Sequence, residues 1–445
     1  MRADRRPELS LCCSVNSPPA RVAAAFAPLA GLDAEIVLAV DDRVDRGWID
    51  GYRQIADRVL LVPFPGNFAL MYAWMREQCA GRWILQLDLD EIPAAGLAEE
   101  VAQTIAAGDV THAWLPRRWL YPDGSSWLAQ WPWRPDYALR LVRNDPALLR
   151  FPALLHCTVR ALGPARYLRA PLYHADLLLT DPAARARKQA AYERELPGFV
   201  IDGLSLNEVY YLPERRADLR LAPVPAADAP AVAEFLQAGA GAPVPEPPRR
   251  AAPRTVGSAT VAEIQRLSEQ RTLGEGAYEA ALVLLDDDLR LVAGEWRTFD
   301  VEVHNRGDAR WPGGMDARPQ IRLAYRWLGP NDEPLEEGAR TALPAPLAPG
   351  ARAVVPLEVL GPSPPGARVI EIDVVHEHVR WFDCAIRAAI DVRRAAGAAR
   401  APRISAVRRR LRRRARSRAA YGLLARRRWR SRARWLGVRA PRRNA

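Results

Sequence analysis

Short apolar runs alternate with segments of helical periodicity along the first two hundred residues. The runs predict strands at 9–15, 35–40, 58–62 and 83–87, with helices at 19–29, 48–56 and 67–79 between them. Strands separated by helices indicate βαβ units and a mostly parallel sheet. Ligands bind such sheets beyond the carboxyl ends of the strands. Two acidic clusters, at 41–42 and 88–91, fall at predicted carboxyl ends.

The pattern changes after residue 212. Residues 221–253 contain eight prolines among alanines and glycines, which disfavours both helix and central strand and predicts a linker, with a short helix following near residue 260. From 278 to 394 the apolar period becomes two, in runs separated by Gly, Pro and Asn turns. Several short strands with no helix between them predict a β-sandwich.

The segment with the strongest chemical signal is a buried strand that continues into Asp88-Leu89-Asp90-Glu91. Three carboxylates in four positions repel one another in a low-dielectric cleft unless a cation compensates them. Mg²⁺ or Mn²⁺ suits this setting, because it binds one or two carboxylates and leaves positions for phosphate oxygens and water. The alternative is a solvated acidic turn before a helix, whose N-terminus favours Asp90 or Glu91.

Several segments of the first 212 residues resemble glycosyltransferase family 2, the inverting enzymes with a GT-A fold. The similarity spans residues 8–212 and is carried by segments 10–16, 35–42, 83–93, 136–144, 151–156, 171–174 and 187–193. The period-two region resembles Ig-like modules, through Trp296, Asn305-Arg306-Gly307, Trp311-Pro312, Trp327 and Trp381-Phe382. The expected fold class is therefore α/β, a Rossmann-like GT-A domain followed by an Ig-like β-sandwich.

The resemblance implies a role for each acidic cluster. Asp41 or Asp42 would contact the base or ribose of a nucleotide. Asp88 and Asp90 fall on the DxD motif, which binds Mn²⁺ or Mg²⁺ and the diphosphate of a nucleotide sugar. The implied enzyme is a hexosyltransferase-type glycosyltransferase that moves a sugar from a nucleotide-diphospho-sugar to a hydroxyl. The expected acceptor is a bacterial cell-surface polysaccharide or glycolipid.

Other site residues are less determined by the motifs, because the first strand is less aliphatic than in the family and no Glu-Asp catalytic pair matches. Asp136 and His156 are the candidate bases. The alternative for Asp136 is an ion pair with Arg140 or Arg143, and the alternative for His156 is a structural role in the core. His174 is a candidate metal ligand, and the alternative is a structural histidine beside Tyr173. Arg140 and Arg143 are candidate phosphate ligands, and the alternative is that they form ion pairs with neighbouring acidic residues.

These patterns predict four segments. They are a GT-A domain at 1–212, a Pro/Ala-rich linker with a short helix at 213–275, an Ig-like β-sandwich at 276–396 and an Arg-rich tail at 397–445. Two other functions stay open: a noncatalytic glycan-binding or scaffolding protein with a degenerate GT-A domain, and a hydrolase that uses a carboxylate pair.

The formal net charge of +12 comes from the end of the chain and not from its whole length. Residues 400–445 hold 19 arginines and no acidic residue, while 45 basic and 52 acidic residues precede them. Apolar positions at helical spacing predict a basic surface helix that contacts anionic membrane; the alternative is a tail that binds polyanions without specificity. Apolar runs too short to span a bilayer, and no clear signal peptide, predict a cytoplasmic protein, with peripheral contact at the inner face of the cell membrane.

Overall fold

The computed structural model describes residues 6–63, 68–150, 159–195, 200–201, 204–241, 273–314, 320–330, 332–377 and 379–395. The chain divides into two units, Met1–Arg393 and Arg394–Ala445, and every helix and strand described below belongs to the first. His156, the helix expected near residue 260 and the Arg-rich tail lie outside the described residues.

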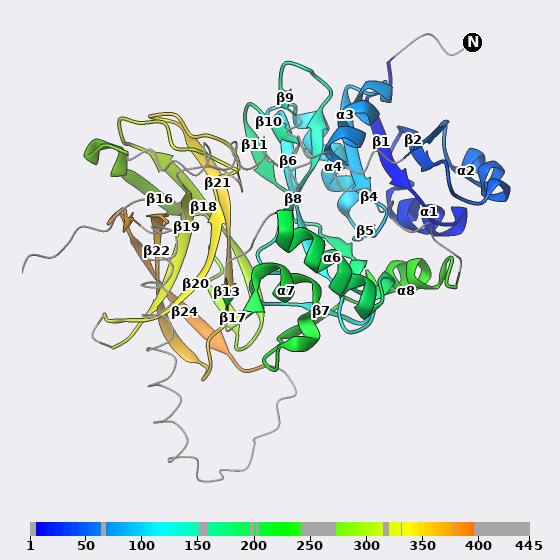
Figure 1. Cartoon of the computed structure of the whole chain (residues 1–445). Helices are drawn as coiled ribbons and strands as arrows, with labels where there is room; N and C mark the ends of the chain where they lie inside the picture. Colours follow the sequence, from blue (N-terminus) through cyan, green and yellow to red (C-terminus); the bar gives the residue numbers. More distant parts are fainter. Residues whose placement is uncertain are drawn as a thin grey trace, which may run out of the picture. The chain divides into compact units, whose positions relative to one another are not determined.

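A mixed nine-stranded sheet organises the first half of the chain (Figure 1). Its order is β3-β2-β1-β4-β8-β6-β12-β5, with β11 paired to β6. Strands β3, β2, β1 and β4 run parallel, whereas β8 joins β4 and β6 in antiparallel fashion. The strands are β1 (Leu9–Val15), β2 (Ala34–Asp41), β3 (Arg58–Val62), β4 (Trp83–Asp88), β5 (Glu91–Pro93), β6 (His112–Trp119), β8 (Tyr137–Arg143), β11 (Ala165–Tyr167) and β12 (Leu172–His174).

Helices cover both faces of this sheet, so its central strands are apolar on both sides. Leu11 and Cys13 of β1 pack with helices α1 (Pro19–Phe26), α2 (Ile49–Ile55) and α4 (Leu97–Ala107) in one core cluster. Cys12 points to the opposite face and packs with Met71 and Met75 of α3 (Phe68–Gln78). This alternation is the period-two consequence of strand geometry.

The strands and helices predicted for the first 90 residues agree closely with the structure, but the structure of the Pro-rich segment differs from the prediction. Residues 221–253, expected to avoid helix and strand, contain β15 (Leu221–Pro223) and α8 (Ala229–Gln237). Pro230 lies in the first helical turn, where a missing N–H costs nothing, and alanines favour the rest of the helix. Val232 and Phe235 are buried in the same core as α1, so this part of the segment belongs to the folded body.

Two further sheets occupy residues 273–395, called here the two-sheet region. One has the order β16-β18-β21 and the other β17-β24-β22-β19-β20, with β23 paired to β22. Their buried residues, among them Phe299 and Trp311, form one shared core. The strands are β16 (Ala280–Leu284), β17 (Arg290–Val292), β18 (Trp296–Asn305), β19 (Ile321–Leu328), β20 (Pro334–Ala342), β21 (Arg352–Leu360), β22 (Gly366–His376), β23 (Arg380–Trp381) and β24 (Ile386–Arg393).

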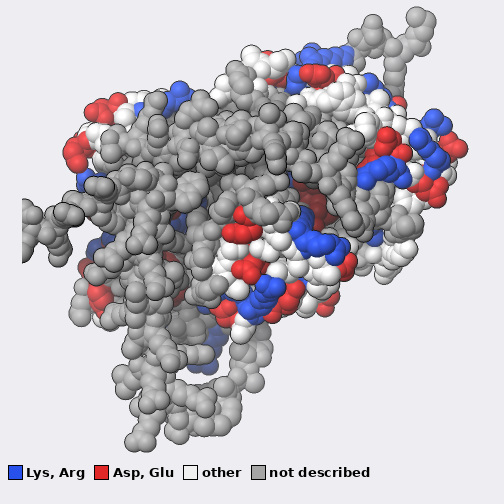
Figure 2. Space-filling view, viewed as in Figure 1, with Lys and Arg blue, Asp and Glu red and all other residues white. Residues whose placement is uncertain are grey.

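The remaining elements are short and lie between the sheet strands. They are β7 (Ser126–Leu128), β9 (Leu149–Arg150), β10 (Arg160–Ala161), β13 (Val200–Ile201), β14 (Leu204–Ser205), α5 (Asp176–Leu179), α6 (Pro182–Glu195) and α7 (Leu206–Tyr211). Within the described ranges, each helix is too short or too polar to cross a bilayer. Acidic and basic side chains are interspersed over the described surface in Figure 2.

Candidate functional site

The candidate site lies at the carboxyl ends of β1, β2 and β4. From β1 the chain builds outward through β2 and β3, and it then returns to β4 on the other side of β1. Such a reversal of strand order leaves a crevice where ligands bind in open α/β sheets. Ser14 of β1 is level with Ala39 and with Asp88, so the ends of β2 and β4 share one edge.

Asp88 is held by two neighbours in this edge. The Tyr72 hydroxyl donates a hydrogen bond to one carboxylate oxygen, and the Arg140 guanidinium binds the other. Burial alone would raise the pKa of Asp88, but the charge of Arg140 and the bond from Tyr72 outweigh burial and lower it. Asp88 is therefore a charged and firmly held carboxylate.

Glu91 shares the same guanidinium. Its Oε1 lies 2.6 Å from Nη2 of Arg140, and its Oε2 accepts a bond of 3.1 Å from the Asp88 backbone N–H. The Glu91 side chain is fully buried, and burial raises its pKa against the opposing charge of Arg140. Arg140 thus supplies part of the compensating positive charge that the sequence assigned to a metal ion.

Asp90 faces the other way, toward His174. The two side chains approach to 3.4 Å, between Oδ2 and Nε2, and β5 pairs with β12 so that Glu91 is level with His174. The Trp119 ring packs edge-on against the imidazole with centroids 4.2 Å apart. The Nδ1 atom of His174 is buried without a hydrogen-bond partner. Buried polar atoms without a hydrogen-bond partner are uncommon in folded proteins.

Asp176 and Lys188 extend the charged cluster. Lys188 of α6 lies 2.9 Å from Asp176 and is about a third exposed. Burial, together with the charges of Asp176 and Asp88, raises the pKa of Asp90 to about 7. Burial, helped by the charge of Arg117, lowers the pKa of His174 to about 4. At neutral pH the imidazole is therefore unprotonated and able to act as a ligand.

Asp136 is fully engaged by other side chains. Arg117 binds it through two nitrogens at 3.0 and 3.1 Å, and the Trp119 indole N–H donates a bond of 2.7 Å. The pairing of Asp136 with Arg140 or Arg143, considered from the sequence, is wrong, because Arg117 on the neighbouring strand β6 takes this place. A carboxylate whose oxygens are occupied by these three donors is poorly placed to accept the proton of an acceptor hydroxyl.

The structure separates the other predicted phosphate and nucleoside contacts. Arg143 pairs with Trp83 at the start of β4, at the opposite end of that strand from Asp88, and it bonds the Gly108 and Val110 carbonyls. A phosphate contact from Arg143 at the candidate site is therefore excluded by strand register. Arg140 reaches the site, but it binds carboxylates there. Asp41 is buried and bound by Arg43, while Asp42 beside it is partly exposed.

The fit of a divalent cation depends on Asp90 and His174. Within the described part of the chain, no group of three or more His, Cys, Asp and Glu side chains is arranged to hold a metal ion. Asp90 Oδ2 and His174 Nε2, which lie 3.4 Å apart, nevertheless offer one oxygen and one nitrogen ligand. Mg²⁺ and Mn²⁺ sites commonly complete such a pair with substrate phosphates and water.

Sequence reasoning missed four residues of this cluster: Tyr72, Arg117, Asp176 and Lys188. Three of them come from α3, β6 and α5, and only tertiary packing brings them to the strand ends. Lys188 carried a signal that could have been used, because it is the single lysine among 64 basic residues. A lysine differs from the surrounding arginines in that its ammonium is a compact charge on a flexible side chain.

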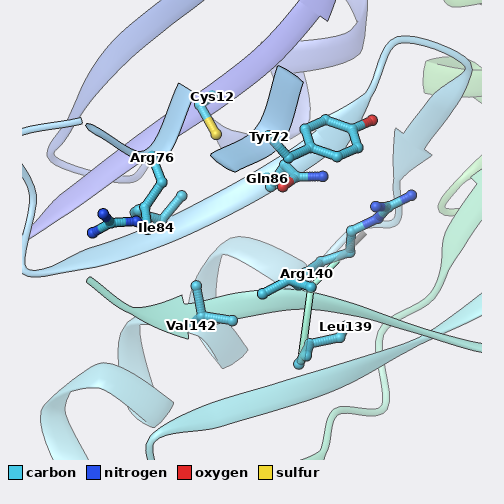
Figure 3. A pocket seen from close by; sticks show the side chains of 9 residues that line it. Cys12, Tyr72, Arg76, Ile84, Gln86, Leu139, Arg140 and Val142 are labelled. Atoms are coloured by element: carbon cyan, nitrogen blue, oxygen red, sulfur yellow. The ribbon is translucent and has the colours of Figure 1, made fainter. Parts of the chain in front are cut away.

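A small pocket adjoins the cluster on the α3 side of the sheet. Its lining includes Cys12, Tyr72, Gln86 and Arg140. In Figure 3 the Tyr72 hydroxyl and the Arg140 guanidinium point toward the same end of this pocket, where both bind Asp88. The Gln86 amide nitrogen is buried without a hydrogen-bond partner. The pocket is lined mainly by apolar side chains and belongs to the support of Asp88.

Comparisons with known proteins give no family assignment. No family model matches the chain, and no curated protein sequence matches it. S. aureus TarS is similar in structure at 11% identity over 88% of this chain and 79% of that chain, with a TM-score of 0.29. TarS 1–349 in complex with UDP-GlcNAc is 13% identical over 44% of this chain and 68% of that chain, with a TM-score of 0.28.

A third solved structure is also similar to part of the chain. A CARDB domain from Pyrococcus furiosus, solved with di-metal ions, is 13% identical over 28% of this chain and 100% of that chain, with a TM-score of 0.20. Scores this low do not establish a shared fold. The function of this chain is therefore argued from its own residues.

Proposed function

We propose that the protein is a metal-dependent glycosyltransferase. It would move a sugar, with inversion, from a nucleotide-diphospho-sugar to a hydroxyl of a surface polysaccharide or glycolipid, using a GT-A type of fold. The observation that carries the proposal is the approach of Asp90 Oδ2 to His174 Nε2 at 3.4 Å, beside an imidazole that burial keeps unprotonated at neutral pH. Lys188 places a cation next to this pair, as binding of a diphosphate requires.

Each part of the cluster has a distinct role in this proposal. Asp90 and His174 would hold Mn²⁺ or Mg²⁺, which supplies Lewis-acid neutralisation of charge on the leaving diphosphate. Asp88, with Arg140 and Tyr72, would fix the loop that carries Asp90. Since both Asp41 oxygens bind Arg43, Asp42 is the better candidate for a contact to the nucleoside.

The base is the least defined part of the proposal. An inverting transfer needs a group that accepts the acceptor's hydroxyl proton as the new bond forms. Asp136 is bound by Arg117 and Trp119, so we assign it a positioning role. His156, which lies outside the described residues, remains the candidate base to test. His156→Ala should lower kcat far more than donor affinity.

A thermal-shift screen tests donor binding directly. Uridine, guanosine and thymidine diphospho-sugars, including UDP-GlcNAc, are compared with and without Mn²⁺. A ligand at 100 times its Kd stabilises the native state by about 2.7 kcal/mol, so a true donor raises Tm only when the metal is present. The Asp90→Asn and His174→Gln variants should lose this increase. A donor that raises Tm as much in these variants as in the unmutated protein would contradict the proposal.

A noncatalytic glycan-binding or scaffolding role is the second candidate. It is favoured by the engagement of both Asp88 and Asp136, which leaves no evident base among the described residues. Turnover separates the two roles. Donor hydrolysis or transfer that disappears in an Asp88→Ala, Asp90→Ala double variant supports the enzyme, whereas an unmutated protein that binds glycans and turns over no donor supports the scaffold.

A further inference from the structure

The two-sheet region packs directly against the strands that build the candidate site. The Trp114 indole of β6 donates to the Pro344 carbonyl at 3.0 Å, and the Tyr167 hydroxyl of β11 donates to the Ala342 carbonyl at 2.8 Å. In the opposite direction, the Trp296 indole donates to the Ala129 carbonyl at 2.8 Å. These bonds cross between segments that the sequence assigned to separate domains.

Glu358 of β21 is the charged centre of this contact. Its side chain is 2% exposed, and the Tyr137 hydroxyl donates to its Oε1 at 3.1 Å. Arg134 approaches its Oε2 to 2.5 Å in an ion pair that lacks hydrogen-bond alignment, and Arg118 lies 3.8 Å from Oε1. A buried carboxylate with two guanidinium partners is costly to disrupt on one side only.

Tryptophan rings enclose the two arginines. The Arg134 guanidinium lies over the rings of Trp127 and Trp296, at 5.1 and 4.7 Å, and Arg118 lies over Trp127 at 4.6 Å. Burial lowers the pKa of Arg134 to about 10 despite the charge of Glu358. One tryptophan comes from each side of the contact, so Arg134 is held between both segments by cation–π contacts, whereas Arg118 contacts only Trp127.

Adjacent residues connect Glu358 to the candidate site. On β6, Arg118 faces Glu358, while its neighbour Arg117 faces Asp136. At the start of β8, Tyr137 faces Glu358, while the preceding residue Asp136 faces Arg117. Successive residues of a strand point to opposite faces, so the same two backbone segments carry both contacts. The Arg117 N–H also donates to the Asp136 carbonyl at 2.8 Å.

The connection reaches the proposed metal ligands through one more step. Trp119 of β6 donates to Asp136 and packs against His174. Strand β12 pairs with β6 so that Arg118 is level with Tyr173 and Trp119 is level with His174. A shift of Arg118 therefore moves the backbone that sets the position of His174.

We propose that Glu358 is a positioning residue for the candidate site, and that the two-sheet region serves as a structural support of the site. In this role Glu358 draws Arg118 and Tyr137 to one side of the β6–β8 pair, which orients Arg117, Asp136 and Trp119 on the other side. The affinity part of this inference rests on the proposed function, whereas the part about strand order does not.

Hydrogen exchange of the full chain tests the inference, with Glu358→Gln compared against Glu302→Gln. Glu302 lies on β18 of the same sheet and pairs with Arg352 away from this contact, so it is a matched control. We expect amides of residues 117–119 and 137–140 to exchange at least tenfold faster in Glu358→Gln, with changes under twofold in Glu302→Gln. Equal exchange in the two variants, or a change confined to β21, would overturn the proposal.

Donor binding separates a positioning role from simple adhesion between the two segments. At a temperature well below Tm, a positioning role predicts at least a tenfold rise in the donor Kd of Glu358→Gln, with recovery in Glu358→Asp. An adhesive role predicts a lower Tm with unchanged Kd, which would overturn the proposal. If Glu358→Gln does not fold, Glu358→Asp alone is compared with Glu302→Asp. If the unmutated protein binds no donor, the proposed function fails, and the exchange result still decides the inference.

Discussion

At the scale of single residues, the site replaces part of an expected metal charge with an internal guanidinium. The three carboxylates at 88–91 indicated a cation from the sequence, and Arg140 supplies one by binding both Asp88 and Glu91. Asp90 differs because it faces His174. The acidic motif is thus divided between two carboxylates held by Arg140 and a third that faces His174.

Removal of Arg140 tests this division. Arg140 and Glu91 have side chains that are 4% and 0% exposed, so Arg140→Met leaves two poorly compensated acids. We expect a loss of about 3–5 kcal/mol in the free energy of unfolding, measured by urea denaturation. Adding Glu91→Gln should restore part of it. As a control, Arg166→Met removes an exposed pair with Asp109 and should cost less than about 1 kcal/mol. Equal losses in the two single variants would contradict the assignment.

The Asp90–His174 pair predicts opposite pH effects in two single variants. The pKa of Asp90 is raised to about 7, so the folded protein keeps a proton that the unfolded chain releases near pH 4. Stability from Asp90 therefore falls as pH rises from about 4 to 7. The pKa of His174 is lowered to about 4, so the unfolded chain binds the extra proton and stability rises over about pH 4 to 6.5.

In the unmutated protein these two effects oppose each other. Asp90→Asn should leave the His174 effect, with stability rising from pH 4 to 6.5, and His174→Gln should leave the Asp90 effect, with stability falling from pH 4 to 7. Urea titrations at several pH values, in buffer with a chelator, measure both slopes. Slopes of the same sign would show that the assigned pKa directions are wrong.

At the scale of elements, local patterns predicted strands and helices well, and tertiary contacts decided the rest. β1 and β3 have the expected bounds, because each is a short and largely apolar run; β1 is almost wholly buried, whereas β3 at the sheet edge is mostly half-buried. The sequence did not predict helix α8, because the prolines of residues 221–253 disfavour a helix; only Pro230 lies in α8, where it occupies the first turn. The ion pair of Arg117 with Asp136 depends on the pairing of β6 with β8, which no local pattern contains.

The start of β1 also explains its unusual polar residue. The Ser10 hydroxyl donates to Glu35 at 2.6 Å and accepts from the Gly81 N–H at 2.8 Å, so it ties the starts of β1, β2 and β4 together. The serine that departs from an aliphatic strand pattern therefore fixes the strand starts. The carboxyl ends, and the candidate site with them, keep their relative level through this register.

Close packing at Gly81 gives a test of this element. An added Cβ would lie 2.4 Å from the Ser10 nitrogen and 2.6 Å from the Leu9 carbonyl carbon. Gly81→Ala should therefore destabilise the protein by about 1–3 kcal/mol, measured by urea denaturation. Gly31→Ala is the control, because nothing lies within 4 Å of its added Cβ. A loss at Gly81 no larger than at Gly31 would contradict the proposed close contact.

At the scale of the whole molecule, charge is distributed very unevenly. The net charge is +12, yet the 19 arginines of residues 400–445 outweigh a small acidic excess in the residues before them. We propose that this tail brings the protein to anionic membrane at the inner face of the cell membrane, where a glycolipid acceptor would be concentrated. Each basic residue near such a surface contributes about 1 kcal/mol.

Vesicle sedimentation tests the tail. The full chain should bind vesicles that contain anionic lipid and leave neutral vesicles unbound, and a chain shortened after residue 395 should bind neither. The shortened chain should keep its donor-dependent Tm increase. If RNA instead competes fully with vesicles and binds more tightly, the alternative of nonspecific polyanion binding is supported.

The single lysine of the chain makes the candidate site chemically addressable. Lys188 is about a third exposed and lies 2.9 Å from Asp176. An ester that acylates amines has only this side chain and the N-terminal amine to modify. Acylation would remove the positive charge that the proposed function places next to Asp90 and His174, so the modified protein should lose its metal-dependent gain in Tm with a donor.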